Sequence, residues 1–310
     1  MPDIRIITNP NSKANKLTPG RINQLSDIVN TKAVLDVSNS LNQLETIIKN
    51  HLVYKPKIVV IDGGDGTVSR ILSAAYKFYN KTQLPSFVLL GGGTMNVLAN
   101  DLGIRGCYQK KLKRLLEMND PFTSLKTLTR TSIIVENNVG FLYADGSSLN
   151  ILNEFYRDKK GHFEAFCLGA RIIFSALHHG QLYQSLIKGR PITFLPKPQT
   201  AALHHNSLST IVASISKLPL NIPLLMNLKN FESKLQAISI TSSAKNLLWH
   251  FPFILLNNKE GESIGKFHFL CDELEIRGED PFSYTLDGEV YSSESNVLSI
   301  RRGPKINFLV

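Results

Sequence analysis

The part of the sequence best suited to chemistry is the segment GGDGT at residues 63–67. Glycines in a row let a ligand lie directly against backbone N–H groups, and the apolar spacing after Thr67 predicts a helix whose N-terminus favours a phosphate. A carboxylate beside phosphates is repelled unless a divalent cation lies between them or unless it handles a proton, so Asp65 indicates one of these roles. The alternative is a tight strand-to-helix turn with Asp65 as its cap.

Strands and helices alternate around this segment. We predict strands at 4–10, 33–37, 57–64 and 86–93, and helices at 20–30, 41–50, 68–80 and from 95 onward. This alternation indicates a doubly wound α/β nucleotide-binding domain with a parallel sheet between two layers of helices. Ligands bind at the carboxyl ends of such strands, where three candidate loops lie, at 9–15, 63–67 and 91–96.

Short β-rich segments dominate the sequence after about residue 120 and predict an antiparallel, sandwich-like domain. The apolar stretch 161–180 interrupts them. We interpret it as a buried helix in preference to a membrane-facing or acyl-binding segment. Near the C-terminus, Asp287 and Glu289 flank Gly288 after an alternating strand. Two carboxylates spaced by one residue on an extended strand share a face and therefore a site, although Asp-Gly is also a common hairpin pair.

Composition limits the class of protein. The 310 residues are enough for two domains, and a net charge of +10 indicates an anionic partner such as a nucleotide, a membrane surface or a nucleic acid. The three cysteines form no CxxC pair, which argues against a zinc site and favours a reducing cytosol. The N-terminus has no signal-peptide layout, and no apolar run reaches the length of a membrane span. We therefore expect a cytoplasmic protein whose membrane contact, if it has one, is peripheral at the inner face.

Four motifs in this order resemble the catalytic family of diacylglycerol kinases, which includes bacterial lipid kinases and sphingosine kinases. They are Asn9-Pro10, the GGDGT at 63–67, the GTMN at 93–96 and the DGE at 287–289. The resemblance implies an α/β kinase domain at 1–122, a β-rich sandwich at 123–297 with the inserted apolar helix, and a segment at 298–310 that returns to the first domain.

The resemblance further implies ATP and Mg²⁺ as cofactors and transfer of the γ-phosphoryl group to a lipid hydroxyl. The implied nucleotide-binding residues are Asn9, Pro10, Asn11, Ser12, Gly63, Gly64, Asp65, Gly66, Thr67, Gly92, Gly93, Thr94 and Asn96. Asp65 is the expected Mg²⁺ ligand. Asp287 is the expected general base, with Glu289 and then Asp65 as alternatives that the sequence does not separate.

Two departures from the family pattern affect this interpretation. Lys13-Ala14 stands where a glycine is usual in the first loop, and Val97 stands where an aspartate usually follows Asn96, with Asp101 the nearest carboxylate. The alternatives are an NAD kinase, although no asparagine–glutamate pair follows the third glycine loop, and a degenerate lipid- or nucleotide-binding protein. We expect no nucleic-acid partner, because phosphate loops explain the positive charge more economically. The identity of the lipid and the oligomeric state stay open.

Overall fold

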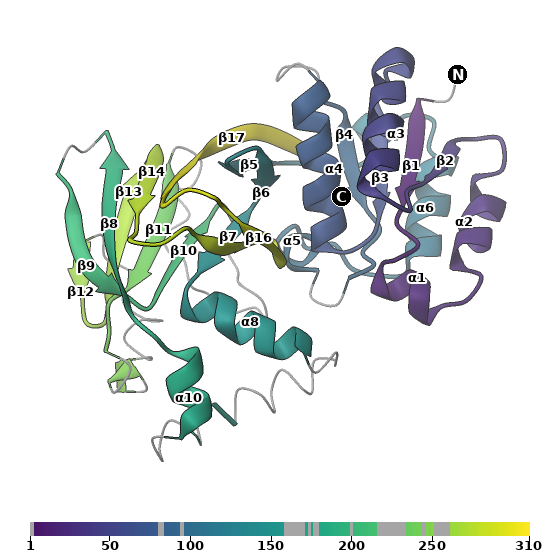
Figure 1. Cartoon of the computed structure of the whole chain (residues 1–310). Coiled ribbons are helices and arrows are strands. Elements are labelled where there is room, and N and C mark those ends of the chain that lie inside the picture. Colours follow the sequence, from purple (N-terminus) through teal and green to yellow (C-terminus); the bar gives the residue numbers. More distant parts are fainter. Residues whose placement is uncertain are drawn as a thin grey trace.

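The computed structural model describes residues 3–79, 84–93, 96–157, 171–172, 175, 180–198, 201–215, 234–243, 246–247, 249–250 and 261–310. The chain forms an N-terminal lobe of alternating strands and helices and a second lobe rich in antiparallel strands (Figure 1). The predicted apolar helix at 161–180 lies almost entirely outside the described residues, as does Thr94. Among the described residues, no helix combines the length and apolar character that a membrane span requires.

A parallel sheet forms the centre of the N-terminal lobe, in the order β2-β1-β3-β4. Its strands are β1 (Ile4–Thr8), β2 (Val34–Val37), β3 (Ile58–Asp62) and β4 (Ser86–Leu89). Its helices are α1 (Lys13–Leu17), α2 (Arg21–Val29), α3 (Leu41–Tyr54), α4 (Asp65–Phe78), α5 (Val97–Asp101), α6 (Tyr108–Glu117) and α7 (Pro121–Ser124).

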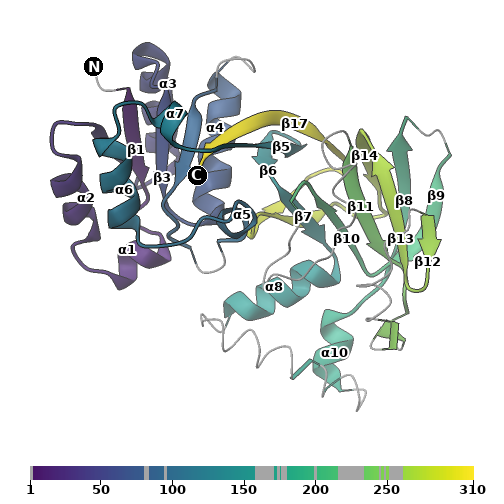
Figure 2. The ribbon, with the colours of Figure 1, turned by 180° about the vertical axis from the view of Figure 1, so that it is seen from behind.

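Side chains of β3 alternate between the two faces of this sheet, as strand geometry requires. Val59 and Ile61 pack in one core with α3 and α4, whereas Ile58 and Val60 pack in another with α2 and α6. Figure 2, seen from behind, shows α2 and α6 on the face opposite to that of α3 and α4 in Figure 1. Helices therefore cover both faces, and the predicted doubly wound α/β fold is confirmed.

Two helices differ from the sequence-based prediction. Helix α4 begins at Asp65 and not at residue 68, because Gly64 is its N-cap and the GGDGT segment already contains the first helical turn. Helix α6 was not predicted, because its basic residues mask a narrow apolar stripe in which Leu112 and Leu115 are buried. Within α6, the Nζ of Lys111 donates to the carbonyl of Leu90 at 3.0 Å, so this lysine faces the protein interior.

The second lobe is a sandwich of antiparallel strands, which confirms the prediction of a β-rich domain. One sheet has the order β12-β13-β11-β10-β7-β15-β16, and β14, β8 and β9 continue the other. The strands are β5 (Thr127–Val135), β6 (Asn138–Gly140), β7 (Leu142–Asp145), β8 (Arg190–Lys197), β9 (Leu203–Ser207), β10 (Ser209–Ala213), β11 (Leu235–Ile240), β12 (Gly261–Ser263), β13 (Lys266–Cys271), β14 (Glu273–Arg277), β15 (Ser283–Leu286) and β16 (Glu289–Ser292). Helices α8 (Ser147–Arg157) and α10 (Gln181–Leu186) lie at one end of the sandwich (Figure 1).

The last strand, β17 (Val297–Leu309), joins the two lobes. Its first half pairs with β14 of the sandwich, and Phe308 near its end pairs in parallel with Phe87 of β4. The same strand pairs along most of its length with β5. One continuous sheet therefore runs from the parallel strands into the sandwich, which fixes the position of the sandwich relative to the glycine loops (Figure 2).

Candidate active site

The three loops at the carboxyl ends of β1, β3 and β4 pack against one another. The N–H of Gly92 donates to the carbonyl of Gly63 at 2.7 Å, and the N–H of Ala14 donates to the carbonyl of Gly92 at 3.1 Å. Gly64 and Gly93 approach so closely that a methyl group on Gly64 would lie 2.7 Å from the Cα of Gly93. Bare backbone is thus needed for contact between the loops.

A buried polar cluster around Asp62 holds the first of these loops in place. The carboxylate of Asp62 accepts from Thr8 at 2.8 Å and from the side-chain amide of Asn15 at 3.0 Å, and it pairs with Arg21 at 2.5 Å. The ring of Tyr108 covers the guanidinium of Arg21 at 3.7 Å. Because both charges of the pair are almost fully buried, removing either one would leave an uncompensated charge.

Asp65 lies at the first turn of α4 and faces the start of α5. Its two oxygens accept from the N–H groups of Val97 at 3.0 Å and Leu98 at 3.2 Å. Burial raises the pKa of Asp65, and these N–H groups oppose that rise. Val97, which stands where the family usually has an aspartate, therefore contributes its backbone N–H to Asp65 and no carboxylate. Asp101 does not replace the missing aspartate, because it is buried in an ion pair with Arg130 at 2.8 Å.

Asp287 reaches the same cleft from the sandwich. It forms a two-residue turn with Gly288 between β15 and β16, in which both residues have positive φ, 51° and 86°. The expectation that Asp287 lies on an extended strand is therefore wrong, because the Asp-Gly pair is a hairpin turn. The N–H groups of Phe141 and Leu142 donate to its carboxylate at 3.0 and 2.9 Å. Burial raises the pKa of Asp287 to about 7, and the nearby charge of Asp65 adds to the rise.

Glu289 follows this turn but faces a different neighbour. Its carboxylate pairs with the guanidinium of Arg70 on α4. It also lies against Gly66, where an added Cβ would be 2.1 Å from its Oε1. The two carboxylates of the DGE motif thus both reach the cleft, yet Asp287 is buried against backbone amides whereas Glu289 is partly exposed and held by a cation.

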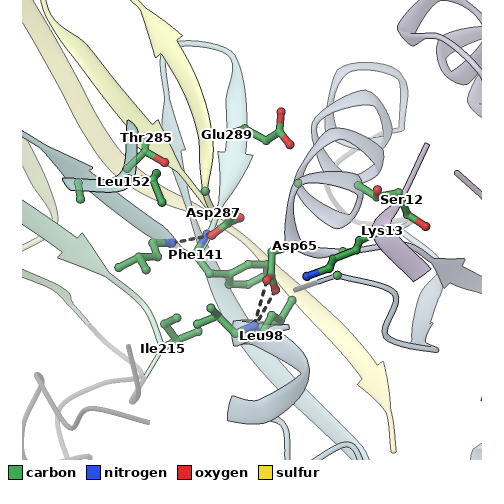
Figure 3. Close-up of a pocket in the computed structure, with 18 of the residues that line it drawn as sticks. Ser12, Lys13, Asp65, Leu98, Phe141, Leu152, Ile215, Thr285, Asp287 and Glu289 are labelled. Carbon is green, nitrogen blue, oxygen red and sulfur yellow. Dashed lines mark hydrogen bonds between the residues drawn. The ribbon is translucent and has the colours of Figure 1, made fainter. Parts of the chain in front are cut away.

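A cavity of about 410 Å³ connects these groups (Figure 3). One end is polar and includes Ser12, Lys13 and Asp65 together with the glycines of two loops. The other end is apolar and lies between the sandwich and α8, where Leu152 and Ile215 line it. Phe141, Leu142, Ala144 and Ile211 add to the apolar lining, Ser148 and Thr285 add two hydroxyls, and Val97 and Leu98 lie beside Asp65. Asp287 lies between the two ends, next to Phe141 and Asp65 in the close-up.

Most of the predicted site residues that the structure describes meet in this cavity. The residues that line it are Asn9, Asn11, Ser12, Gly64, Asp65, Gly66, Thr67, Gly93, Asp287 and Glu289. Pro10, Gly63, Gly92 and Asn96 do not line it. Among these, Asn96 accepts from the N–H of Gly93 at 2.9 Å and so shapes the third loop. Thr94 lies outside the described residues.

Sequence reasoning missed three groups that the structure places at the site. The backbone amides of Phe141 and Leu142 carry no side-chain signal. The apolar lining from α8 and β10 comes from ordinary core-like residues. Arg70 is 219 residues from its partner Glu289 in the sequence. Lys13 also lines the cavity, and the sequence showed it as a departure from the usual glycine.

A second, narrower groove continues from the polar end of the cavity. It shares Asn9, Asn11 and Thr67 with the main cavity and passes Ser38, Asn39 and Leu41. Arg70 and Leu41 also line a third hollow, of about 550 Å³, between α3, α4 and β16. An elongated ligand whose charged end lies at the glycine loops therefore has room to extend along α4.

The residues present fit a magnesium ion that is shared with a phosphorylated ligand. Within the described part of the chain, no three His, Cys, Asp or Glu side chains group closely enough to hold a metal by themselves. Mg²⁺ usually takes one or two carboxylates and completes its shell with substrate phosphates and water. The hydrogen bonds that Asp65 accepts from Val97 and Leu98 involve one N–H group per carboxylate oxygen, and each oxygen has a second lone pair that can face a cation.

Comparison with known proteins finds a family model that is similar to the N-terminal lobe. Residues 3–124 match the model of the diacylglycerol kinase catalytic domain, which confirms the resemblance inferred from the motifs. A search among curated proteins found no match.

Solved structures of similar fold align with almost the whole length of this chain. One is described as a diacylglycerol kinase from Bacillus anthracis, with a TM-score of 0.64 and 14% identity. Two others from the same organism are each described as "a putative diacylglycerol kinase", with TM-scores of 0.70 and 0.69 and identities of 14% and 16%. Each alignment covers 99% of this chain and 96% of the other. At this identity the likeness establishes the two-domain fold.

Proposed function

We propose that this protein is an ATP- and Mg²⁺-dependent lipid kinase that transfers the γ-phosphoryl group of ATP to the hydroxyl of a diacylglycerol-like or sphingoid-like lipid. The observation that carries the proposal is the position of Asp287 in a single cavity, between glycine loops suited to phosphates and an apolar end suited to an acyl chain. The lipid is taken from the cytoplasmic face of a membrane, which the protein contacts peripherally.

In this proposal, the glycine loops bind the phosphates of ATP at the polar end of the cavity. Backbone N–H groups of the segment 63–67 and the hydroxyl of Thr67 surround the triphosphate, and the N-terminus of α4 favours its negative charge. The side-chain amide of Asn9 holds the Thr67 hydroxyl at 2.9 Å, which orients that group. The narrow groove past Ser38 and Leu41 receives the nucleoside. Asp65 would hold Mg²⁺, which neutralises phosphate charge when bound.

Asp287 is the general base in this proposal. A pKa of about 7 means that a substantial fraction of the carboxylate is ionised at neutral pH and able to accept a proton. The N–H groups of Phe141 and Leu142 fix its orientation toward the acceptor hydroxyl. Glu289 is already engaged with Arg70, and Asp65 is the residue that this proposal assigns to Mg²⁺, which leaves Asp287 for the acceptor proton. The proton of the lipid hydroxyl passes to Asp287 as the hydroxyl oxygen attacks the γ-phosphorus, and the bond from the γ-phosphorus to the β–γ bridging oxygen breaks so that ADP leaves.

The test is transfer of labelled γ-phosphate from ATP to candidate acceptors in mixed micelles with Mg²⁺. The acceptors are diacylglycerol, monoacylglycerol, phosphatidylglycerol, sphingosine and NAD. We expect label in one lipid and a rate of labelling at least about 100-fold lower in the Asp287→Asn variant. Label in NAD would identify an NAD kinase instead. Binding of ATP without label in any acceptor would favour a catalytically degenerate binding protein.

A further inference from the structure

Lys13 projects into the polar end of the cavity from the position where the family usually has a glycine. Figure 3 shows its ammonium group directed toward Asp65. Among the described residues that line this cavity, Lys13 is the one Lys or Arg. The opposing charges there are the carboxylates Asp65, Asp287 and Glu289.

The backbone around Lys13 is fixed although its side chain is exposed. Ser12 caps helix α1, and Ala14 donates to Gly92 in the third loop, which ties this turn to the glycine loops. The side-chain amide of Asn15 bonds to Thr8, to the carbonyl of Asn9, to Ser12 and to Asp62. Residues on both sides of Lys13 are thus anchored, and the lysine points into the cleft from a rigid turn.

No ion pair within the described residues occupies the ammonium of Lys13, whereas Arg21 and Arg70 are engaged with Asp62 and Glu289. Lys13 is therefore a cation that is available to a ligand at the place where the glycine loops would hold phosphates. Lysine is a compact donor of three hydrogen bonds, and it binds phosphate as a point charge.

We propose that Lys13 is a phosphate-binding residue that contacts the terminal phosphates of the nucleotide and supplies a positive charge to the group being transferred. The inference rests on the nucleotide site of the proposed function but not on the identity of the acceptor. A charge at this position compensates for the backbone contact that a glycine would offer. It also makes affinity depend on the number of phosphates in the ligand.

The test is calorimetric titration of ATP, ADP and adenosine, each with Mg²⁺, into the wild-type chain and three variants. Lys13→Met removes the charge and keeps the length, Lys13→Arg keeps the charge, and Lys16→Met is the matched control. Lys16 is exposed on the same short helix and does not line the cavity. Thermal melting of each variant confirms that it is folded.

We expect Lys13→Met to weaken ATP binding by about 10- to 100-fold, since a hydrogen bond to a charged group is lost. Binding of adenosine should change less than about twofold, and Lys13→Arg should recover most of the affinity for ATP. Unchanged ATP binding in Lys13→Met overturns the inference. An equal loss for ATP and adenosine, or an equal effect of Lys16→Met, also overturns it.

The experiment separates this inference from the proposed function. A wild-type chain that binds ATP through Lys13 but labels no lipid would support the inference and contradict the lipid kinase. Equal labelling of a lipid by the wild type and by Lys13→Met, at ATP concentrations below saturation, would support the lipid kinase and contradict the role of Lys13. A wild-type chain that binds neither ATP nor ADP would overturn both.

Discussion

The backbones of Gly64 and Gly93 are in direct contact, so that a Cβ on Gly93 would lie 2.6 Å from the Cα of Gly64. These residues belong to different loops, after β3 and β4, and both line the main cavity. Their contact is between backbones, which cannot turn aside as a side chain can. The separation of the two loops is therefore set by the absence of side chains at these two positions.

The first prediction concerns this contact. Gly93→Ala should force the second and third loops apart and lower kcat/KM for phosphoryl transfer by roughly 100-fold, because misplacement of about 1 Å in a positioned site has an effect of that size. Steady-state kinetics with the best lipid acceptor measure it.

Gly103→Ala is the control for a general effect of adding a methyl group to a glycine. Gly103 has a φ of 71° and no atom within 4 Å of an added Cβ. It should therefore lose about 1 kcal/mol of stability from backbone strain with no change in kinetics. Equal kinetic losses in the two variants would show that the Gly64–Gly93 contact has no special role.

The second prediction concerns the cost of keeping Asp287 in its buried turn. Its pKa is raised from 3.8 to about 7 in the folded chain, so the ionised carboxylate destabilises the fold by up to about 4 kcal/mol above pH 7. The folded state binds the extra proton between these two values, so this penalty grows with pH through that window and is absent below it. Asp287→Asn should therefore raise the free energy of unfolding at pH 8 and have much less effect at pH 4.

Asparagine suits this test because it tolerates the positive φ of residue 287 and keeps an oxygen for the N–H groups of Phe141 and Leu142. Urea denaturation at the two pH values measures the effect. The same variant should lose about 100- to 10,000-fold in the rate of transfer. A variant that is less stable than the wild type at pH 8 would contradict the assigned rise in pKa.

The third prediction is a pH profile. Because Asp287 must be ionised to accept a proton, kcat/KM for the lipid should fall about tenfold per pH unit below an apparent pKa of about 7 and level off above it. Glu289→Gln should lower the rate without moving this limb. A limb that disappears in Glu289→Gln would make Glu289 the base.

The arrangement of the N-terminal lobe was predictable because its signals are local. Residues 58–61 form a continuous run of β-branched apolar residues, which is typical of a strand buried on both faces, and the glycines after β3 indicate the turn within a few residues. The Asp-Gly pair at 287–288 forms the hairpin turn that its sequence predicts, and the same turn places Asp287 at the cavity, so the hairpin and a role in the candidate site do not exclude each other. A tight turn is what projects Asp287 from the sheet into the cleft.

The remainder of the site was not predictable because it depends on contacts between distant segments. Arg70 meets Glu289 only after β17 has joined the lobes, and Asp65 meets Val97 only once the loops after β3 and β4 are packed. The apolar end of the cavity is lined by Leu152 and Ile215 from different elements. Such residues are ordinary core residues in sequence, and only their position around a cavity distinguishes them.

The last prediction concerns this apolar end. Leu152 lies on α8 and lines the cavity beyond Asp287, so Leu152→Trp should fill the space proposed for an acyl chain. We expect KM for a long-chain lipid to rise by about 10-fold or more, because filling the space displaces several methylenes, each worth about 0.8 kcal/mol. The affinity for ATP should not change, since the glycine loops lie at the other end of the cavity. Asn153→Trp is the matched control, because Asn153 is exposed on the same helix and does not line the cavity. An equal rise in KM for short-chain and long-chain acceptors in Leu152→Trp would place the acyl chain elsewhere.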